Sequence, residues 1–301
     1  MRERDEAAPA KVNLTLSVRA RRADGYHEIE SLVVFARVGD RLRLAPGGAL
    51  ELEVAGPFAS AVGGAADNLV LVAARELAAR VEGLSLGRFT LLKRLPIAAG
   101  LGGGSADAAA AMRLIARANG LGLDDARVFS AARATGADVP ICLDSCARLM
   151  RGIGEILSAP LVLPELPAVL VNPGMPMLTA DVFVAFDLAR CATLARAAAS
   201  PALADLIGSA ALGTAPLRAA LIAALDEARN DLQPPAISIQ PAIGDVLASL
   251  RALAGCRLAR MSGSGATCFA LFDSEGAAAA AAAALAASHP GWWVEPTVLG
   301  R

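Results

Sequence analysis

The stretch Gly100-Leu-Gly-Gly-Gly-Ser-Ala-Asp107 is the feature that most restricts how this chain can fold. It follows a strand candidate, Phe89 to Leu95, and precedes Ala106 to Ala118, whose Ala, Met and Leu content favours helix. Glycines have no Cβ, so successive backbone N–H groups can surround phosphate oxygens while the following helix turns its positive dipole end to the same anion. The order strand, glycine loop and helix therefore predicts a phosphate-binding loop.

This loop matches neither of the two common phosphate motifs in full. No Gly-Lys-Ser/Thr follows it, so it is not a Walker A loop, and the sixth position of a dinucleotide-binding pattern is Ser105. The chain also lacks the catalytic-loop and metal-binding triplets of protein kinases. A tight turn is the alternative, but four glycines and a serine that open a helix favour anion binding. The candidate phosphate-binding residues are Gly100, Leu101, Gly102, Gly103, Gly104 and Ser105.

A second glycine loop, Met261-Ser-Gly-Ser-Gly-Ala-Thr267, lies between strand-like segments near the end of the chain. On its own it reads equally well as a plain hairpin turn. Two such loops in one chain suggest two sides of a single phosphate site, to which Gly263 and Gly265 would belong.

The length of 301 residues indicates about two domains at roughly 150 residues each. With 55% hydrophobic and 19% charged residues, the chain has enough apolar material for a large core. Up to residue 83 we expect a strand-rich block and then a helix capped by Asp67 or Asn68. The strands should break at Gly39-Asp40 and at Pro46-Gly47-Gly48. Prolines punctuate the chain after Leu157, which predicts domains at 1–157 and 158–301. In the second we expect helices at 179–188, 217–228, 243–254 and 277–287, and a strand, loop and strand at 262–272.

Charge, cysteine content and hydropathy narrow the class of protein to which the chain can belong. A net charge of -1 gives no general attraction for nucleic acid or an anionic membrane surface. The five cysteines are an odd number in a long chain, which argues against a disulfide framework and favours buried thiols. The first residues lack an apolar signal-like segment, and the longest apolar run, Ala277 to Ala287, is shorter than the ~20 residues of a membrane span. We therefore expect a cytoplasmic protein.

Five other residues are candidates for a role in the chemistry. Asp138, in Gly136-Ala-Asp-Val-Pro140, could accept a proton from a hydroxyl, although a lone Asp is often a helix cap. Tyr26 and His27 could bind a nucleobase, or they could simply decorate a surface turn. Only Lys11 and Lys93 are lysines among 28 basic residues, which hints at a need for a compact ammonium group. For Lys93, in a strand-like stretch beside an arginine, we expect a solvated surface charge.

Taken together, five ordered motifs resemble those of the GHMP small-molecule kinases. They are Ala8-Pro-Ala-Lys-Val-Asn-Leu14, Arg22-Ala-Asp-Gly-Tyr-His-Glu28, Leu95-Pro-Ile-Ala-Ala-Gly-Leu-Gly-Gly-Gly-Ser-Ala-Asp107, Gly136-Ala-Asp-Val-Pro140 and Met261-Ser-Gly-Ser-Gly-Ala-Thr267. The resemblance runs from about residue 8 to about residue 272. It implies an α+β fold of two domains, an N-terminal ATP-binding domain and a C-terminal substrate-binding domain, with the active site in the cleft between them. ATP would bind over the first glycine loop, with Mg²⁺ bridging its phosphates.

The same resemblance implies the role of each site residue. Asp138 would take the proton of the acceptor hydroxyl, Lys11 would stabilise charge around the transferred phosphoryl group, and Asn68 would lie near the adenine. The substrate would be held by Asn13, Tyr26, His27, Thr179 and Phe183, with the loop glycines Gly263 and Gly265. The pairing of Asp-Gly-Tyr-His with Ala-Lys-Val-Asn implies ATP-dependent phosphorylation of the 2-hydroxyl of a CDP-linked methylerythritol.

Two alternatives remain open at this stage. One is a GHMP kinase acting on homoserine, mevalonate or a sugar, and the other is a non-catalytic nucleotide-binding relative. We expect a monomer or a homodimer. Residues 191–215 and the Ala-rich segment after Asp273 carry no recognisable motif.

Overall fold

The computed structural model describes residues 4–64, 67–190, 201–211 and 217–300. The chain forms two compact units, and each is assembled from separate segments. The first unit consists of Met1–Lys11, Gly39–Ile97 and Gly102–Ser145, and the second consists of Val12–Val38, Ala98–Leu101 and Cys146–Arg301. The division of function into an ATP-binding domain at 1–157 and a substrate-binding domain at 158–301 stays a prediction.

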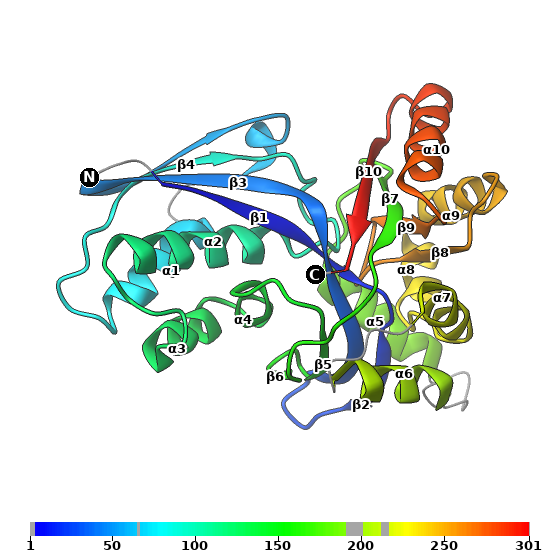
Figure 1. Ribbon diagram of the computed structural model, residues 1–301, viewed down its shortest axis with the longest axis horizontal. Coiled ribbons are helices and arrows are strands. Elements are labelled where there is room, and N and C mark those ends of the chain that lie inside the picture. Colours follow the sequence, from blue (N-terminus) through cyan, green and yellow to red (C-terminus); the bar gives the residue numbers. More distant parts are fainter. Residues whose placement is uncertain (1–3, 65–66, 191–200, 212–216, 301) are drawn as a thin grey trace. The chain divides into compact units, whose positions relative to one another are not determined.

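The first unit places helices on one face of a strand layer (Figure 1). Its strands are the first part of β1 (Arg4–Asn13), the second part of β3 (His27–Ala55), and β4 (Gly87–Leu92). Its α-helices are α1 (Leu69–Ala78), α2 (Gly103–Ala118), α3 (Ala126–Thr135) and α4 (Val139–Cys142), and a short 3-10 helix, η1, covers Ala59–Ala61. α2 is buried without interruption from Ala106 to Ala116, and its small alanines let α1 pack closely against it. α2 is therefore the central helix of this unit.

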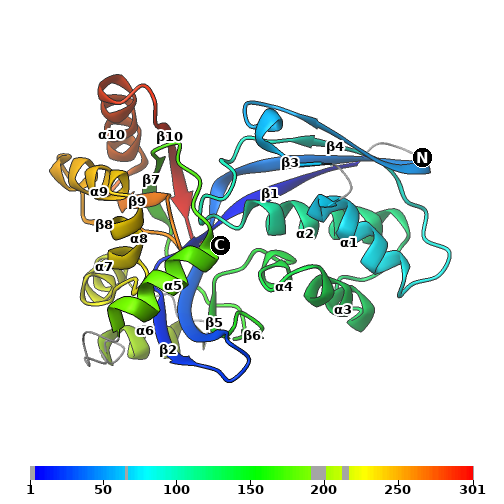
Figure 2. The same cartoon turned by 180° about the vertical axis from the view of Figure 1, so that it is seen from behind.

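The second unit is a sheet with helices packed beside it, seen from behind in Figure 2. Its strands are β2 (Ser17–Arg21), β5 (Arg148–Gly152), β6 (Ile156–Leu157), β7 (Leu166–Asn172), β8 (Leu258–Met261), β9 (Cys268–Leu271) and β10 (Trp293–Leu299), joined by the first part of β3. Its helices are α5 (Thr179–Arg190), α6 (Pro201–Ala211), α7 (Arg218–Glu227), α8 (Gln233–Ile239), α9 (Ala242–Ala252) and α10 (Glu275–Ser288). The strand order is β6-β5-β3-β10-β7-β9-β8, and β10 pairs antiparallel with β7 from Trp293↔Asn172 to Leu299↔Leu166.

The sequence predicted most helices of the fold but not all of its strands. The helices expected near residues 69, 106, 179, 217, 243 and 277 are confirmed, and the Asn68 side chain caps α1 by accepting from the Val70 amide. The expected break at Gly39-Asp40 is wrong, because β3 continues through it. The chain does reverse at Gly47-Gly48: β4 pairs with residues 41–46 in descending register and with residues 51–55 in ascending register.

β7 (Leu166–Asn172) lies in the proline-containing stretch after Leu157, where the sequence predicted no strand. All seven of its residues are buried, so the sequence shows no alternation of apolar and polar positions there. β10 was also not predicted.

Two expectations about the chain as a whole can be compared with the structure. No helix among residues 4–64, 67–190, 201–211 and 217–300 is long and apolar enough to cross a membrane. Of the cysteines in these ranges, none forms a disulfide; Cys142 and Cys268 are buried, whereas Cys146 and Cys256 are half-buried. The prediction against a disulfide framework is confirmed for them, and Cys191 lies outside the described residues.

Gly39 shows how tightly β1 and β3 approach each other. A Cβ at this position would lie 2.3 Å from the Ala8 carbonyl oxygen and 2.6 Å from Pro9 Cα, and both are backbone atoms that cannot rotate away. We expect Gly39→Ala to lower the free energy of unfolding by roughly 1–3 kcal/mol, measured by urea denaturation. Gly63→Ala is the matched control, because a Cβ there meets nothing within 4 Å, and it should change stability by less than about 0.5 kcal/mol. Equal effects of the two variants would contradict this view of the strand contact.

Candidate active site

Lys11 and Asp138 form an ion pair in the first unit. β1 carries Lys11, Asp138 is the residue before α4, and the Lys11 Nζ lies 2.7 Å from the Asp138 Oδ2. The Lys11 side chain is buried at 5% exposure, whereas that of Asp138 is 35% exposed. Asp138 stands at the N-cap of α4, yet its side chain makes no capping hydrogen bond. The alternative interpretation, a capping side chain, is therefore wrong, and the carboxylate keeps one oxygen for another partner.

The glycines that open α2 are packed against side chains of the same unit. A Cβ on Gly102, whose φ is +60°, would lie 3.2 Å from Lys11 Cβ. A Cβ on Gly103 would lie 3.2 Å from the Lys93 Nζ, and one on Gly104 would lie 3.3 Å from Leu69 Cδ1. Side chains of the same unit therefore pack closely against these three glycines, independently of any ligand.

The amides at the start of α2 are oriented as in any helix N-terminus. The first hydrogen bond of this helix runs from the Ala106 amide to the Gly102 carbonyl at 2.9 Å. The amides of Gly103, Gly104 and Ser105 precede it, so they have no intrahelical acceptor and point along the positive end of the helix dipole. This is the local structure that the sequence predicted for a phosphate-binding loop.

The expectation of a solvated charge at Lys93 is wrong. Its side chain is 3% exposed, and its ammonium lies 2.5 Å from Asp40 Oδ2 and 2.7 Å from Asp107 Oδ2. Asp40 also accepts hydrogen bonds from the amides of Arg94 and Leu95 through its Oδ1. Lys93 thus links β3, through Asp40, to α2, through Asp107, and its ammonium lies next to Gly103. We call Lys93, Asp40 and Asp107 the buried triad.

The charges of the buried triad do not cancel. Burial lowers the pKa of Lys93, but the two carboxylates outweigh this and hold it above its usual value. Burial raises the pKa of Asp107 to about 7; Lys93 opposes this rise and Asp40 adds to it. Asp107 Oδ1 is also buried without a hydrogen-bond partner. One ammonium serves two carboxylates, and Asp107 is the less well satisfied of the two.

In the second unit the two glycine loops touch. A Cβ on Gly100 would lie 2.5 Å from the Ser262 carbonyl oxygen and 2.8 Å from that of Gly265, while the Ser262 hydroxyl donates to the Gly100 carbonyl at 3.0 Å. A Cβ on Gly263 would lie 3.1 Å from the Gly100 oxygen. The two loops are therefore close together at Gly100, whereas their joint membership of one site stays a prediction. The role of this junction in phosphate binding stays a prediction.

The predicted substrate residues of this unit form two groups. Asn13 donates from its side chain to the Ser31 hydroxyl at 2.7 Å and from its amide to Ser262, which places it beside the second glycine loop. Thr179, at the start of α5, shares a hydrogen bond of 2.9 Å with the Ser264 hydroxyl. These contacts place Asn13 and Thr179 at the second loop.

The second group surrounds His27. The imidazole stacks on the Phe183 ring, with centroids 4.8 Å apart and planes at 19°, and its Nε2 lies 2.7 Å from Asp187 Oδ1. Tyr26 is instead 61% exposed. The alternative of a surface decoration is therefore wrong for His27, because its side chain is 6% exposed. Asp187 was not predicted, since one exposed-looking acid on a helix gives no signal in the sequence.

The buried triad provides a test that depends on pH. The folded chain holds the Asp107 proton up to about pH 7, whereas an unfolded chain releases it near pH 4. Between these values the folded state binds more protons at Asp107, so the contribution of this residue to the free energy of unfolding falls as pH rises. Asp107→Asn removes this penalty. We expect its stability relative to the wild type to increase by on the order of a few kcal/mol between pH 4 and pH 8, measured by urea denaturation.

Asp125→Asn is the control, because Arg127 holds the pKa of this exposed carboxyl at about 2 and it stays ionised throughout that range. Its effect should not vary between pH 4 and pH 8. An Asp107→Asn effect that is equally flat would contradict the assignment of a strained, buried carboxyl.

Comparison with known proteins gives a consistent result over the whole chain. Residues 68–145 match the GHMP kinases N terminal domain, and residues 210–291 match GHMP kinases C terminal. The chain is 57% identical to a 4-diphosphocytidyl-2-C-methyl-D-erythritol kinase of Methylorubrum extorquens, over 97% of each chain. It is 59% identical to the protein of that name from Methylobacterium radiotolerans, over 98% of each chain.

Solved structures agree. A crystal structure of 4-(cytidine 5'-diphospho)-2C-methyl-D-erythritol kinase superposes with a TM-score of 0.79 at 34% identity, over 99% of this chain and 100% of the other. Homoserine kinase from Cytophaga hutchinsonii shares the fold, with a TM-score of 0.70 at 20% identity, over 99% and 95% of the two chains. The chain matches both the N-terminal and the C-terminal models of the family, and relatives that are more than half identical align with nearly all of it. The chain therefore belongs to the GHMP kinase family.

Proposed function

We propose that this chain is an ATP-dependent kinase that phosphorylates the 2-hydroxyl of 4-diphosphocytidyl-2-C-methyl-D-erythritol, in the non-mevalonate synthesis of isoprenoid precursors. The observation that carries the proposal is the Lys11–Asp138 pair, 2.7 Å apart, with the Lys11 stem against Gly102 at the start of α2. It brings a carboxylate, an ammonium and a row of amides together within one unit. The relatives that share more than half of the sequence carry this activity in their names.

Asp138 is the proton acceptor in this proposal. Its Oδ2 accepts from the Lys11 ammonium, so Oδ1 can receive the proton of the acceptor hydroxyl. Lys11 then lies where negative charge grows on the attacking oxygen and on the transferred phosphoryl group. Phosphoryl transfer depends mainly on positioning and on charge stabilisation, and a fixed ammonium and carboxylate supply both.

The nucleotide would bind at the start of α2. The amides of Gly103, Gly104 and Ser105 would donate to phosphate oxygens, with the helix dipole adding to the attraction. Asn68 caps α1 with its Oδ1, which leaves its Nδ2 for the adenine. The next residue, Leu69, packs so close to Gly104 that a Cβ added there would lie 3.3 Å from the Leu69 Cδ1. Asn68 therefore lies close to the first turn of α2.

Mg²⁺ would accompany the nucleotide. Within the described segments, no three His, Cys, Asp or Glu side chains are grouped so as to hold a metal ion. Mg²⁺ in kinase sites is usually held by one or two carboxylates together with phosphate oxygens of the substrate, so it does not need a cluster of three protein ligands. The Ser105 hydroxyl is the loop side chain that could complete its coordination, and the ion would supply charge neutralisation.

The substrate would be recognised in the second unit by Tyr26 and His27. The exposed Tyr26 ring offers a face on which the cytosine can stack. In the tautomer in which the His27 Nε2 donates to the Asp187 carboxylate, Nδ1 would accept a hydrogen bond from the exocyclic amino group at the edge of the base. Phe183 holds the imidazole in this orientation. Asn13, Thr179, Gly263 and Gly265 would contact the diphosphate and the alcohol.

The activity is tested by measuring ADP release with ATP, Mg²⁺ and a panel of acceptors. Turnover with 4-diphosphocytidyl-2-C-methyl-D-erythritol, and not with homoserine, mevalonate or a hexose, is the expected result. Equal turnover with methylerythritol phosphate would show that the cytidyl group is not recognised. No ADP release above background with any acceptor would overturn the kinase proposal.

The roles of Lys11 and Asp138 are tested in single-turnover experiments. Asp138→Asn keeps the size of the side chain but removes the base, and Lys11→Met removes the ammonium. Each should lower the rate of phosphoryl transfer by about 10²–10⁴-fold with ATP affinity roughly kept. Glu51→Gln is the control for neutralising an acid elsewhere in the unit, since Glu51 is exposed and pairs only with Arg88 among the described residues. Near-wild-type rates for either site variant would show that its role is misassigned.

Recognition of the base is tested at Tyr26. Removing a stacking partner costs about 1–3 kcal/mol, so Tyr26→Ala should raise the acceptor KM roughly tenfold while the KM for ATP barely moves. Tyr26→Phe keeps the ring and should stay close to the wild type. An unchanged acceptor KM in Tyr26→Ala would exclude stacking on this side chain.

A further inference from the structure

The Lys11–Asp138 pair joins two elements that are far apart in sequence. Its partners are 127 positions apart, and neither element fixes the pair alone. α4 has only four residues, which is too few for a helix to be stable by itself, and Asp138 does not cap it. The distance between the two charged groups therefore depends on whatever holds α4 against β1.

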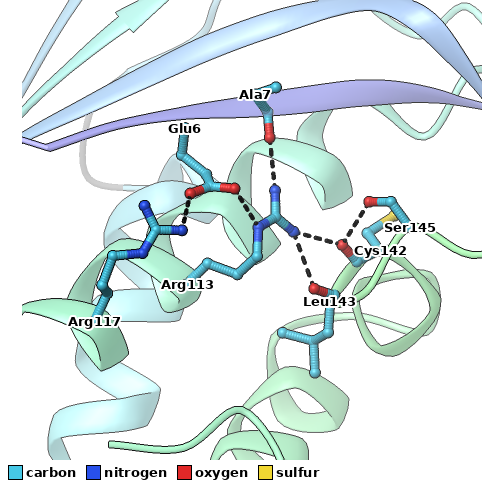
Figure 3. Close-up of polar contacts among 7 residues, drawn as sticks. All are labelled: Glu6, Ala7, Arg113, Arg117, Cys142, Leu143 and Ser145. Atoms are coloured by element: carbon cyan, nitrogen blue, oxygen red, sulfur yellow. Dashed lines mark hydrogen bonds and ion pairs between the residues drawn. The ribbon is translucent and has the colours of Figure 1, made fainter. Parts of the chain in front are cut away.

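Arg113, on α2, makes this connection (Figure 3). Its guanidinium donates to the Ala7 carbonyl on β1 at 2.6 Å, and to the Cys142 and Leu143 carbonyls at 2.7 and 3.3 Å. Ala7 lies four residues before Lys11, and Cys142 lies four residues after Asp138. The guanidinium of Arg113 thus bonds both β1, which carries Lys11, and α4, which follows Asp138. The Ala7 and Cys142 carbonyls are each four residues from their member of the pair.

The surroundings of Arg113 keep its guanidinium in place. Its side chain is 9% exposed, and its Nε donates to Glu6 Oε1 at 3.0 Å, which supplies the compensating charge. The Ser145 hydroxyl donates to the same Cys142 carbonyl at 3.1 Å. Arg117 also bonds Glu6, but its side chain is 49% exposed, and its only drawn contact in Figure 3 is that carboxylate.

We propose that Arg113 is a positioning residue for phosphoryl transfer: it sets the geometry of Lys11 and Asp138 by joining β1 to the end of α4. The inference rests on the proposed function. Its three nitrogens donate to two different elements from one rigid plane, Nε and Nη2 to β1 and Nη1 to the end of α4, and a lysine ammonium on a flexible stem cannot reproduce that fork. Arg113 does not touch Lys11 or Asp138 themselves, so it acts through the backbone of the two elements.

The first experiment compares Arg113→Lys with Arg117→Gln. A displacement of about 1 Å at reacting groups can cost on the order of a hundredfold in rate, so Arg113→Lys should lower the single-turnover rate by about tenfold or more. The KM values for ATP and the acceptor should stay within about twofold, since the amides of α2 and the residues of the second unit are unchanged. Arg117→Gln removes the exposed contact to Glu6 and should behave as the wild type.

A double-mutant cycle separates positioning from general destabilisation. If Arg113 acts through the pair, adding Arg113→Lys to Asp138→Asn should lower the residual rate by less than about twofold, because the group being positioned is already absent. A merely structural role would lower the rate equally in both backgrounds and would overturn the proposal. Wild-type enzyme with no transfer to any acceptor would overturn the proposed function instead.

Glu6→Gln decides the case if Arg113→Lys does not fold. It keeps Arg113 but replaces the charge-assisted bond to Nε with a weaker neutral one, so the guanidinium is held less firmly against its carbonyl acceptors. We expect a loss of a few-fold in single-turnover rate with both KM values kept. A rate equal to that of the wild type would overturn the proposal.

Discussion

Each of the two lysines is buried where a glycine at the start of α2 leaves room for it. The Lys11 stem lies against Gly102 and the Lys93 ammonium lies against Gly103, so a Cβ on either glycine would press on the lysine beneath. Each ammonium bonds at least one aspartate from a different segment. The first glycine loop therefore rests on two buried cations, so its glycines serve the packing of the protein, in addition to the nucleotide-binding role proposed for them.

The sequence predicted the local parts of this arrangement well. Strand, glycine loop and helix were recognisable between residues 89 and 118, because glycine placement and helix propensity are local properties. The capping role of Asn68 and the helices of the second unit were recognisable for the same reason. Lys93 was misread because its environment is made by Asp40 and Asp107, which lie 53 and 14 positions away. Burial of a charge becomes predictable only when its partners are known.

The same limit explains what was missed around His27. Asp187 lies 160 positions from it, on a helix whose exposed apolar and acidic residues show no special pattern. The resemblance to known kinases gave Phe183 a role in holding the substrate, which stays a prediction, and the structure adds that its ring stacks on the His27 imidazole. Tyr26, in the same group, is 61% exposed. Motifs name the residues of a site, whereas the contacts among them decide which surface stays available to a ligand.

The buried lysines and the buried arginines differ in the acceptors that they bond. Its lysines bond carboxylates, for which a compact point charge is enough. Its buried arginines also bond backbone carbonyls: Arg113 bonds those of Ala7, Cys142 and Leu143 besides the Glu6 carboxylate, and Arg260 bonds those of Leu14, Leu225 and Ala228. Burial lowers the pKa of Arg260 to about 10, which still leaves it charged at neutral pH.

A guanidinium keeps its charge where an ammonium would tend to lose it, and its fork reaches several acceptors at once. The Leu14 carbonyl bonded by Arg260 is next in sequence to Asn13, and the Ala7 carbonyl bonded by Arg113 lies four residues before Lys11 on β1. In both units, therefore, a buried arginine fixes the backbone beside a residue of the candidate site.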